Sequence, residues 1–259
     1  MRGIVIDVGN TSTAIARYEG GRVSRVAHIN GGIRRRRAAC IRAVQRAARG
    51  GVEGAMLGSV VPAVNAAWRR LVRRELGCEL RVARAGMPMD VRVDYPRPRT
   101  IGADRLANAC GGVVRYGAPL IVADFGTALT FDIITADRRY VGGVIAPGLP
   151  LMTDYLFERT ALLPHVAIRG PCPKIGRSTR GAIRIGARIG YRGMVRETYA
   201  YLRRSLGPRA RLVATGGYAR WVMQGSGLPC RVDPTLTLFG LGRMLEWDIH
   251  GGAPAGRRA

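Results

Sequence analysis

The amino-acid sequence predicts an α/β protein made of two similar domains. Short runs of β-branched and apolar residues alternate along the chain with longer segments whose apolar residues recur at helical spacing, which is typical of α/β folds. The second observation is a repeat. Asp7-Val-Gly closes one apolar run, and Asp124-Phe-Gly closes another 117 positions later. Each motif is followed by a further apolar run, so a strand–turn–strand unit opens each half of the chain.

The repeat sets the expected domain boundaries. A chain of 259 residues suits one large domain or two compact ones. We expect one domain over residues 1–117, a similar domain over 118–250 facing it across a central cleft, and a disordered tail over 251–259.

In the first half, β-branched runs predict strands, and the first two strands should meet at a tight turn at Gly9-Asn10. The expected strands are 3–7, 12–18, 23–29, 55–62 and 80–84. Apolar residues at helical spacing with arginines between them predict helices that pack one face on a sheet. These helices are 38–48, 63–76 and a third from Ala103 to near Gly117. The segment 87–100 contains three prolines and is expected to be irregular.

The second half repeats the pattern. Strands are expected at 119–124 and 128–134 around a turn at 125–127, then at 138–148, where a strand should lead into a glycine-rich loop. A further strand with a glycine turn is expected at 211–217. Helical spacing is found at 149–162, at 179–206, where glycines interrupt it, and at 234–246, with a loop through Pro171 and Pro173 between the first two.

The strong positive charge does not by itself predict a nucleic-acid-binding protein. The formal net charge is +25, but the basic residues are spread along the whole chain, and Lys174 is the only lysine. This skew is typical of GC-rich coding rather than of a designed groove. The run 34–37 is four arginines and is expected to be the exposed start of a helix. We therefore do not expect nucleic-acid binding, although a positive surface attracts anionic substrates such as nucleotides.

Other features exclude several classes of protein. No run approaches the roughly 18 apolar residues of a membrane helix, and the N-terminus lacks a secretory pattern, so we expect a cytoplasmic protein. The five cysteines are scattered and odd in number, which argues against a disulfide framework or a zinc cluster. The three histidines are isolated from each other and from any nucleophile signature, so a catalytic triad is not expected.

The two Asp-x-Gly turns have the parts needed to bind a nucleotide. A turn next to glycine exposes N–H groups that can surround phosphate oxygens, and the hydroxyls of Thr11 and Thr127 can add hydrogen bonds. Aspartate repels phosphate unless a cation lies between them, and Mg²⁺ prefers such hard oxygen ligands. For a single copy, an ordinary structural turn explains the motif equally well. The repetition favours two hairpins that hold a phosphate chain from both sides.

The tetrapeptide Gly-Ala-Asp-Arg at 102–105 has the parts for phosphoryl transfer to an alcohol. Asp104 could accept the hydroxyl proton, and Arg105 could bind an anionic group of the acceptor or offset developing charge. For an isolated tetrapeptide, a helix N-cap with a surface ion pair explains the same residues.

Taken in order, the motifs resemble those of a known family. D-V-G-N-T, S-V-V-P, Y-x-x-P-x-x-x-G-A-D-R, D-F-G-T-A-x-T-x-D, G-G-V-I-A-P-G and T-G-G closely resemble the type III pantothenate kinases, over residues 3–245. These enzymes belong to the acetate and sugar kinase, Hsp70 and actin superfamily. The resemblance implies two ribonuclease-H-like domains. It also implies transfer of the γ-phosphoryl group of ATP, bound with Mg²⁺, to the primary hydroxyl of pantothenate, the first step of coenzyme A synthesis.

The resemblance also implies roles for individual residues. The first phosphate loop would consist of Asp7, Val8, Gly9, Asn10, Thr11, Ser12, Thr13 and Ala14, and Thr127 would also contact ATP. Asp104 would be the catalytic base. The pantothenate pocket would be lined by Tyr95, Gly102, Ala103, Asp104 and Arg105.

Two further roles depend on the resemblance alone. Asp124 would ligate an activating monovalent cation, potassium or ammonium. Thr179 would contact substrate in the active site of the partner subunit of a homodimer, although it could instead cap a helix that starts at Arg180. Ala14 replaces a lysine that some family members carry, and Ser178 replaces a frequent asparagine; neither change removes a required group.

Two other functions stay open. The same fold could serve as a non-catalytic accessory factor in transcription, which the positive charge would suit, or as a kinase of another small hydroxy acid. Retention of Asp104, Arg105, Asp124 and Thr127 favours catalysis, because a binding module does not need them together.

Overall fold

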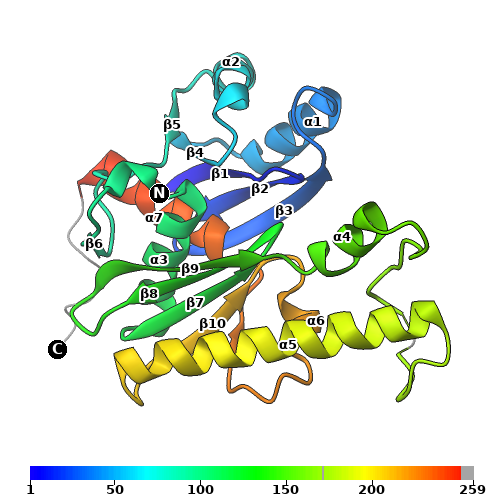
Figure 1. Cartoon of the computed structure of the whole chain (residues 1–259). Coiled ribbons are helices and arrows are strands. Elements are labelled where there is room, and N and C mark those ends of the chain that lie inside the picture. Colours follow the sequence, from blue (N-terminus) through cyan, green and yellow to red (C-terminus); the bar gives the residue numbers. More distant parts are fainter. Residues whose placement is uncertain (171, 252–259) are drawn as a thin grey trace. The chain divides into compact units, whose positions relative to one another are not determined.

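The computed structural model describes residues 1–170 and 172–251 (Figure 1). The chain divides into two compact units that are not continuous in sequence. Unit 1 comprises Met1–Leu120, Asp132–Gly142 and the C-terminal segment from Thr235, and unit 2 comprises Ile121–Phe131 and Gly143–Pro234. The domains 1–117 and 118–250 stay a proposal based on the sequence repeat. The tail expected at 251–259 lies outside the described residues, apart from Gly251.

The first sheet lies in unit 1 and contains the first predicted hairpin. Its strands are β1 (Arg2–Val8), β2 (Ser12–Glu19), β3 (Arg22–Asn30), β4 (Gly54–Ser59) and β5 (Leu80–Val82), in the order β3-β2-β1-β4-β5. β1 is antiparallel to β2 and parallel to β4, so the loops after β1 and β4 leave the same edge of the sheet. β4 ends three residues earlier than predicted, because Pro62 begins a short 3₁₀ helix (Pro62–Val64).

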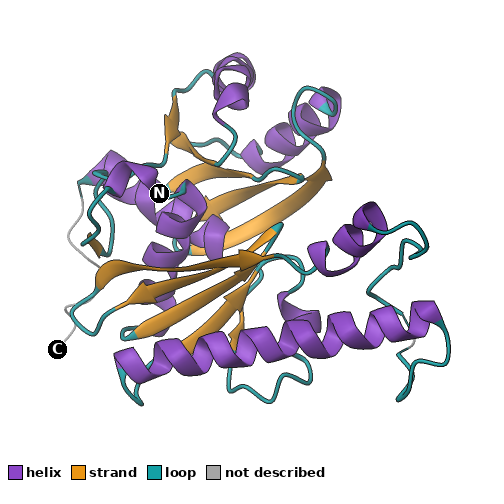
Figure 2. Cartoon of the chain, in the orientation of Figure 1, coloured by secondary structure: helices purple, strands orange, loops and turns teal. Residues whose placement is uncertain are grey.

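Helices cover both faces of this sheet (Figure 2). They are α1 (Arg37–Ala48), α2 (Asn65–Leu76), α3 (Ala103–Tyr116) and α7 (Leu236–His250). Because side chains alternate along a strand, β1 contributes Ile4 and Ile6 to the core with α1 and α2, while Val5 packs with α3 and α7 on the other face. The layering expected from the helical periodicity is therefore present in unit 1.

α3 and α7 pack closely through glycines. A Cβ atom at Gly111 would lie 2.9 Å from the carbonyl oxygen of Leu236 and 3.0 Å from the nitrogen of Gly240. A Cβ atom at Gly240 would overlap the backbone of Ala107, and one at Gly242 would overlap the ring of Tyr18. The missing side chains therefore allow the two helix backbones to approach each other.

The second sheet has the order β11-β10-β7-β8-β9-β6. Its strands are β6 (Arg92–Val93), β7 (Leu120–Phe125), β8 (Ala128–Ile134), β9 (Arg139–Pro147), β10 (Arg211–Thr215) and β11 (Arg231–Val232). β7, β8 and β10 match their predicted ranges closely. The predicted glycine-rich loop after β9 is wrong, because the strand continues through both glycines to Pro147. The segment 87–100 is not wholly irregular, because β6 pairs with the start of β9.

The helices of unit 2 are α4 (Leu151–Arg159), α5 (Thr179–Leu206) and α6 (Ala219–Met223). The helical segment predicted over 179–206 is confirmed, and α5 runs unbroken for 28 residues through its glycines (Figure 1). Its buried residues, among them Ile183, Tyr191 and Val195, hold one face against the rest of the unit, and such packing outweighs the weak helix propensity of glycine. Within the described ranges, no helix is both long and apolar enough to cross a bilayer.

Arginines at every fourth position of α5 bind main-chain carbonyls. Arg180, Arg184 and Arg188 donate to the carbonyl oxygens of His165, Ala167 and Gly170 at 3.1, 3.2 and 3.3 Å. Residues four apart lie on one face of a helix, so this row of side chains lies along the segment 165–170 and holds it at these three carbonyls. One turn further on, Arg192 donates to the carbonyl oxygens of Trp221 and Val222.

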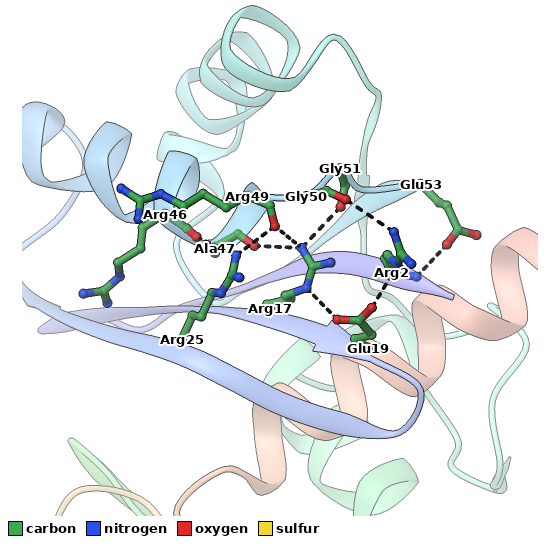
Figure 3. Close-up of polar contacts among 10 residues, drawn as sticks. All are labelled: Arg2, Arg17, Glu19, Arg25, Arg46, Ala47, Arg49, Gly50, Gly51 and Glu53. Carbon is green, nitrogen blue, oxygen red and sulfur yellow. Dashed lines mark hydrogen bonds and ion pairs between the residues drawn. The ribbon is translucent and has the colours of Figure 1, made fainter.

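Arginines of the first sheet bind carbonyls at the end of α1 (Figure 3). The guanidinium of the buried Arg17 donates to the carbonyl oxygens of Ala47, Arg49 and Gly51 at 3.2, 3.1 and 3.2 Å. Arg25 donates to the carbonyl oxygens of Arg46 and Arg49. Cations are favourable there, because the last carbonyls of a helix carry partial negative charge. Part of the large positive charge thus has a structural role.

Candidate active site

The first hairpin turn presents small polar residues at the end of β1. The backbone N–H of Gly9 donates to the carbonyl oxygen of Ser12 at 3.0 Å and closes the turn. Asn10, Thr11 and Ser12 are exposed at its tip, whereas Asp7 is half-buried. The Oγ1 atom of Thr13 is buried and has no hydrogen-bond partner among the described residues. The turn therefore has the exposed backbone and hydroxyl groups expected of a phosphate loop.

The end of β4 lies next to this turn. The N–H of Val60 donates to the carbonyl oxygen of Val8 at 3.1 Å, and Ser59 is the register partner of Val8. A Cβ atom at Gly102, the N-cap residue of α3, would lie 3.5 Å from Cγ1 of Val60. The loop after β4 therefore connects the first turn to the start of α3, where the Gly-Ala-Asp-Arg motif lies.

Asp104 lies in the first turn of α3 and is half-buried. Its Oδ1 atom accepts a hydrogen bond from the N–H of Arg105 at 2.8 Å. Burial raises the pKa of the Asp104 carboxyl, and the hydrogen bond and charge of Arg105 offset only part of that rise. A Cβ atom at Gly102 would overlap the Asp104 carboxylate, so glycine leaves the space that this carboxylate occupies.

Arg105 belongs to a buried polar cluster in unit 1. Its Nε atom donates to Oδ1 of Asp132, on β8, at 2.7 Å, and the hydroxyl of Tyr140, on β9, donates to the same oxygen at 3.1 Å. The guanidinium carbon lies 5.9 Å from the centre of the Tyr140 ring. An N-cap with a surface ion pair is therefore not what the structure shows, since Gly102 is the N-cap residue and the Asp132 side chain is fully buried.

The charges of this cluster are strongly coupled. Burial raises the pKa of Asp132 to about 7, although Arg105 and Tyr140 both favour its ionised form. Burial is the largest influence on the pKa of Arg105 and lowers it, but the charge and hydrogen bond of Asp132, together with Tyr140 and Asp104, outweigh burial and raise that pKa. Arg105 therefore stays a cation beside the half-buried carboxylate of Asp104.

Tyr95 lies beside this cluster. Its ring is 6.4 Å from that of Tyr140 in an edge-on arrangement, and the N–H of Asp94 donates to the carbonyl oxygen of Tyr140 at 2.9 Å. Gly142 has a φ of 113°, and a Cβ atom there would lie 3.1 Å from the Tyr95 ring. Tyr140 thus lies next to both Tyr95 and Arg105 in unit 1, and the acceptor pocket that the resemblance implies stays a proposal.

Unit 2 contains the second Asp-x-Gly turn, at the end of β7. The N–H of Gly126 donates to the carbonyl oxygen of Ala128 at 3.1 Å, which repeats the closure of the first turn. Thr127 is exposed and Asp124 is half-buried. This turn therefore exposes the same kinds of groups as the turn after β1.

Two glycine loops pack against this second turn. Gly216, of the Thr-Gly-Gly motif, has a φ of 91°, and a Cβ atom there would lie 2.5 Å from the Asp124 carboxylate and 2.7 Å from the nitrogen of Phe125. A Cβ atom at Gly148 would lie 2.9 Å from the carbonyl oxygen of Gly126 and would overlap that of Thr127. Three separated motifs therefore meet at one place in unit 2, and only glycine fits at the contact points.

The carboxylate of Asp124 lies next to Gly216 and is a hard oxygen group that could face a cation. Among the described residues there is no group of three or more His, Cys, Asp or Glu side chains that could hold a metal ion. A cation at Asp124 would therefore complete its shell with hard main-chain carbonyls, water or phosphate oxygens.

Thr179 is the first residue of α5 and is exposed. The helix is capped by Ser178, whose Oγ atom accepts from the N–H of Gly181 at 3.1 Å. The N-cap role that Thr179 could have had is therefore filled by Ser178. Because Thr179 belongs to unit 2 and Asp104 to unit 1, its role in catalysis stays a proposal.

Sequence reasoning gave no role to Asp132, Tyr140, Gly148 or Gly216. Asp132 was visible as a carboxylate inside the apolar strand 128–134, where a buried charge demands a partner. The two glycines were noted as motif members, but their contact with the second turn depends on long-range folding.

Comparison with known proteins agrees with this arrangement. A family model described as type III pantothenate kinase matches residues 3–201. The chain belongs to the type III pantothenate kinase family. A type III pantothenate kinase from Akkermansia muciniphila is 46% identical over 73% of this chain and 76% of that protein. One from Geobacillus sp. strain WCH70 is 34% identical over 95% of this chain and 97% of that protein.

The fold of this type III pantothenate kinase is also found in solved structures. A ROK family glucokinase from Streptomyces griseus, solved in complex with glucose and AMPPNP, has a TM-score of 0.52 and 16% identity. The match covers 95% of this chain and 98% of that one. At this identity the likeness concerns the fold alone, and it confirms the predicted two-domain α/β class with two sheets.

Proposed function

We propose that the chain transfers the γ-phosphoryl group of ATP to the primary hydroxyl of pantothenate, giving 4′-phosphopantothenate and ADP in the first step of coenzyme A synthesis. Membership of the type III pantothenate kinase family supports this activity. The observation that carries it is the half-buried carboxylate of Asp104 beside the buried Arg105–Asp132 pair. Because ATP and pantothenate are intracellular metabolites, the proposed site of action is the cytoplasm.

Asp104 serves as the general base. Its carboxylate accepts the proton of the pantothenate hydroxyl as the hydroxyl oxygen bonds to the γ-phosphorus. The bond from that phosphorus to the β–γ bridging oxygen breaks, and ADP leaves with the electron pair. The raised pKa of Asp104 brings it closer to neutral pH, which makes it a better proton acceptor than an exposed aspartate.

Arg105 binds the carboxylate of pantothenate in this proposal. Its fixed cationic charge and planar fork of N–H donors suit carboxylate binding, and Tyr95 adds an exposed ring beside it. Gly102 and Ala103 belong to the same pocket because they begin α3 next to Asp104.

The two Asp-x-Gly turns bind the phosphates. In unit 1, the loop from Asp7 to Ala14 is exposed at Asn10, Thr11 and Ser12, and the last two of these residues offer hydroxyls. In unit 2, Thr127 and the glycine loops around it offer a second set. Mg²⁺ bound with ATP supplies charge neutralisation on the phosphate oxygens.

The function and its cation requirement are tested in one assay. With ATP and Mg²⁺ present, we expect ADP release that depends on pantothenate in potassium or ammonium buffers. In sodium or choline buffers we expect almost no ADP release. The reason is that Asp124 supplies a hard oxygen ligand for a monovalent cation beside the turn that binds phosphate. Absence of ADP release in all four salts would refute the kinase proposal, whereas equal rates in all four would refute the cation site alone.

The same assay separates the alternative functions. A kinase of another small hydroxy acid would release ADP with that acid and not with pantothenate. A transcriptional accessory factor would release no ADP with any acceptor. Asp104 and Arg105 would then have no catalytic role.

We further propose a homodimer with shared active sites. Exposed apolar residues gather in unit 2 on α4, the loop after it and α5: Leu151, Tyr155, Phe157, Leu162, Ile175 and Ile189. These elements contact each other, as the T-shaped pair of Phe157 and His165 shows at 5.6 Å. A patch of exposed apolar residues is typical of a protein interface, and Thr179 is exposed at the start of α5.

Subunit complementation tests the shared site. Mixing an Asp104→Asn chain with a Thr179→Val chain gives heterodimers in which one site carries both lesions and the other carries none. If Thr179→Val alone is inactive, a shared site restores activity on subunit exchange, up to about a quarter of wild type after statistical mixing. Absence of recovery despite demonstrated heterodimers would place Thr179 in its own subunit's site or outside the chemistry.

A further inference from the structure

Asp132 is a fully buried carboxylate in an apolar strand. Its β8 neighbours Leu129, Phe131 and Ile134 are all buried core residues. A buried charge is costly unless it is paired and hydrogen-bonded. The Arg105 Nε atom and the Tyr140 hydroxyl both donate to its Oδ1 atom. Its Oδ2 atom is also buried and has no hydrogen-bond partner among the described residues.

A second buried Arg–Asp pair in unit 1 provides a comparison. Arg243 on α7 donates to both carboxylate oxygens of Asp90 at 3.0 and 3.2 Å, and both side chains are as buried as those of Arg105 and Asp132. Asp90 is thus held by its arginine through two oxygens, in a pair that also involves Glu246 and none of the predicted site residues. Asp132 instead accepts from its arginine through one oxygen only. That arginine, Arg105, is the residue directly after the proposed base Asp104 in α3.

The contacts of Asp132 fix the orientation of Arg105. The hydrogen bond that Nε donates restricts the orientation of the guanidinium group, because Nε is part of its rigid planar fork. The Tyr140 ring, 5.9 Å from the guanidinium carbon, restricts the same group from another side. Long flexible side chains lose rotamer entropy when they bind, so an arginine that is already oriented binds a carboxylate more tightly.

We propose that Asp132, supported by Tyr140, is the positioning residue that holds Arg105 for the carboxylate of the acceptor and so makes the enzyme selective for an acid over its neutral analogue. This inference rests on the proposed pantothenate kinase activity. Asp132 acts through Arg105 and touches neither the hydroxyl that reacts nor the nucleotide.

The test compares two acceptors in the same assay: pantothenate and its alcohol analogue, in which a hydroxymethyl group replaces the carboxylate. Asp132→Asn keeps the size of the side chain but replaces a charge-assisted hydrogen bond with a neutral one. We expect its kcat/KM for pantothenate to fall ~10-fold through KM, while kcat and the kcat/KM for the alcohol analogue change less than about threefold. The KM for ATP should not change.

Three further variants sharpen the test. Tyr140→Phe keeps the ring and removes one hydrogen bond, so a smaller loss of the same kind is expected; it carries the test if Asp132→Asn fails to fold. Asp90→Asn is the matched control, since it weakens the other buried pair and should leave the ratio of the two acceptors unchanged. In an Arg105→Gln background, Asp132→Asn should have no further effect on that ratio, because the residue it acts through is gone.

Equal losses with both acceptors in Asp132→Asn or Tyr140→Phe would show a merely structural role and overturn the proposal. An unchanged ratio in both variants, or a loss of selectivity that persists in the Arg105→Gln background, would also overturn it. Failure of the wild-type enzyme to phosphorylate pantothenate would instead refute the proposed function, so the two failures are distinguishable.

Discussion

Asp104→Asn is expected to lower kcat ~10²–10⁴-fold, because the amide cannot accept the hydroxyl proton that the carboxylate takes. The side chain keeps its size, so pantothenate should still bind with nearly unchanged affinity. Steady-state ADP release and calorimetric titration of pantothenate measure the two quantities. A variant that keeps more than about a tenth of the wild-type rate is incompatible with Asp104 as the base.

The same substitution should make the protein more stable at neutral pH. Because burial raises the pKa of Asp104, its protonated form is the one that the fold favours. Its stabilising contribution is present below the unfolded-state pKa and is lost as the pH rises through the raised folded-state pKa. Asparagine removes that loss, so the Tm of Asp104→Asn should exceed that of wild type near pH 7 and approach it in acid.

The catalytic rate of the wild-type enzyme should also fall as the pH drops through the raised pKa of Asp104, because the protonated carboxyl cannot accept the hydroxyl proton.

Gly240→Ala is expected to be among the most destabilising single changes in the chain. The new Cβ atom would overlap the backbone of Ala107, and a backbone cannot move aside as a flexible side chain can. Overpacking of a well-packed contact typically costs ~1–3 kcal/mol, and a contact against backbone in the α3–α7 interface should reach at least the upper part of that range. Urea unfolding measures the free energy directly.

Gly186→Ala is the matched control for that prediction. Gly186 is also helical, is exposed on α5, and a Cβ atom there would meet nothing within 4 Å. Alanine is a better helix former than glycine, so this variant should be ~0.5–1 kcal/mol more stable than wild type. If both variants lost similar stability, the close α3–α7 packing would not be the cause.

The sequence predicted the elements in which local pattern and fold agree. The turn after β1, the exact span of β8 and the start of α3 each followed from an apolar run that ends at glycine or from helical spacing. The candidate site was predictable in its motifs, because Asp104, Arg105 and the two Asp-x-Gly turns combine residue types that carry chemistry.

The features of the fold and the site that the sequence did not predict depend on contacts between distant segments. β9 continues through Gly142 because β6, whose Arg92 pairs with Arg139, joins the start of β9 and places Tyr95 next to the glycine. Nothing near Arg105 in sequence reveals Asp132 as its partner, and the two meet only when α3 and β8 are folded. α6 and β11 were missed because five and two residues are too short to show a period.

The arginine row of α5 has a consequence for how this protein can vary. Its partners are the carbonyl oxygens of His165, Ala167 and Gly170, and every residue type carries a carbonyl. Substitutions at the exposed positions of 165–170 therefore leave the acceptors of these hydrogen bonds in place, whereas the side chains of Val166 and Ile168 are buried and restrict their own positions. Inserting or deleting one residue would instead shift each carbonyl out of step with the four-residue spacing of the helix. We therefore expect the length of this segment to vary little and its exposed positions to accept many residue types.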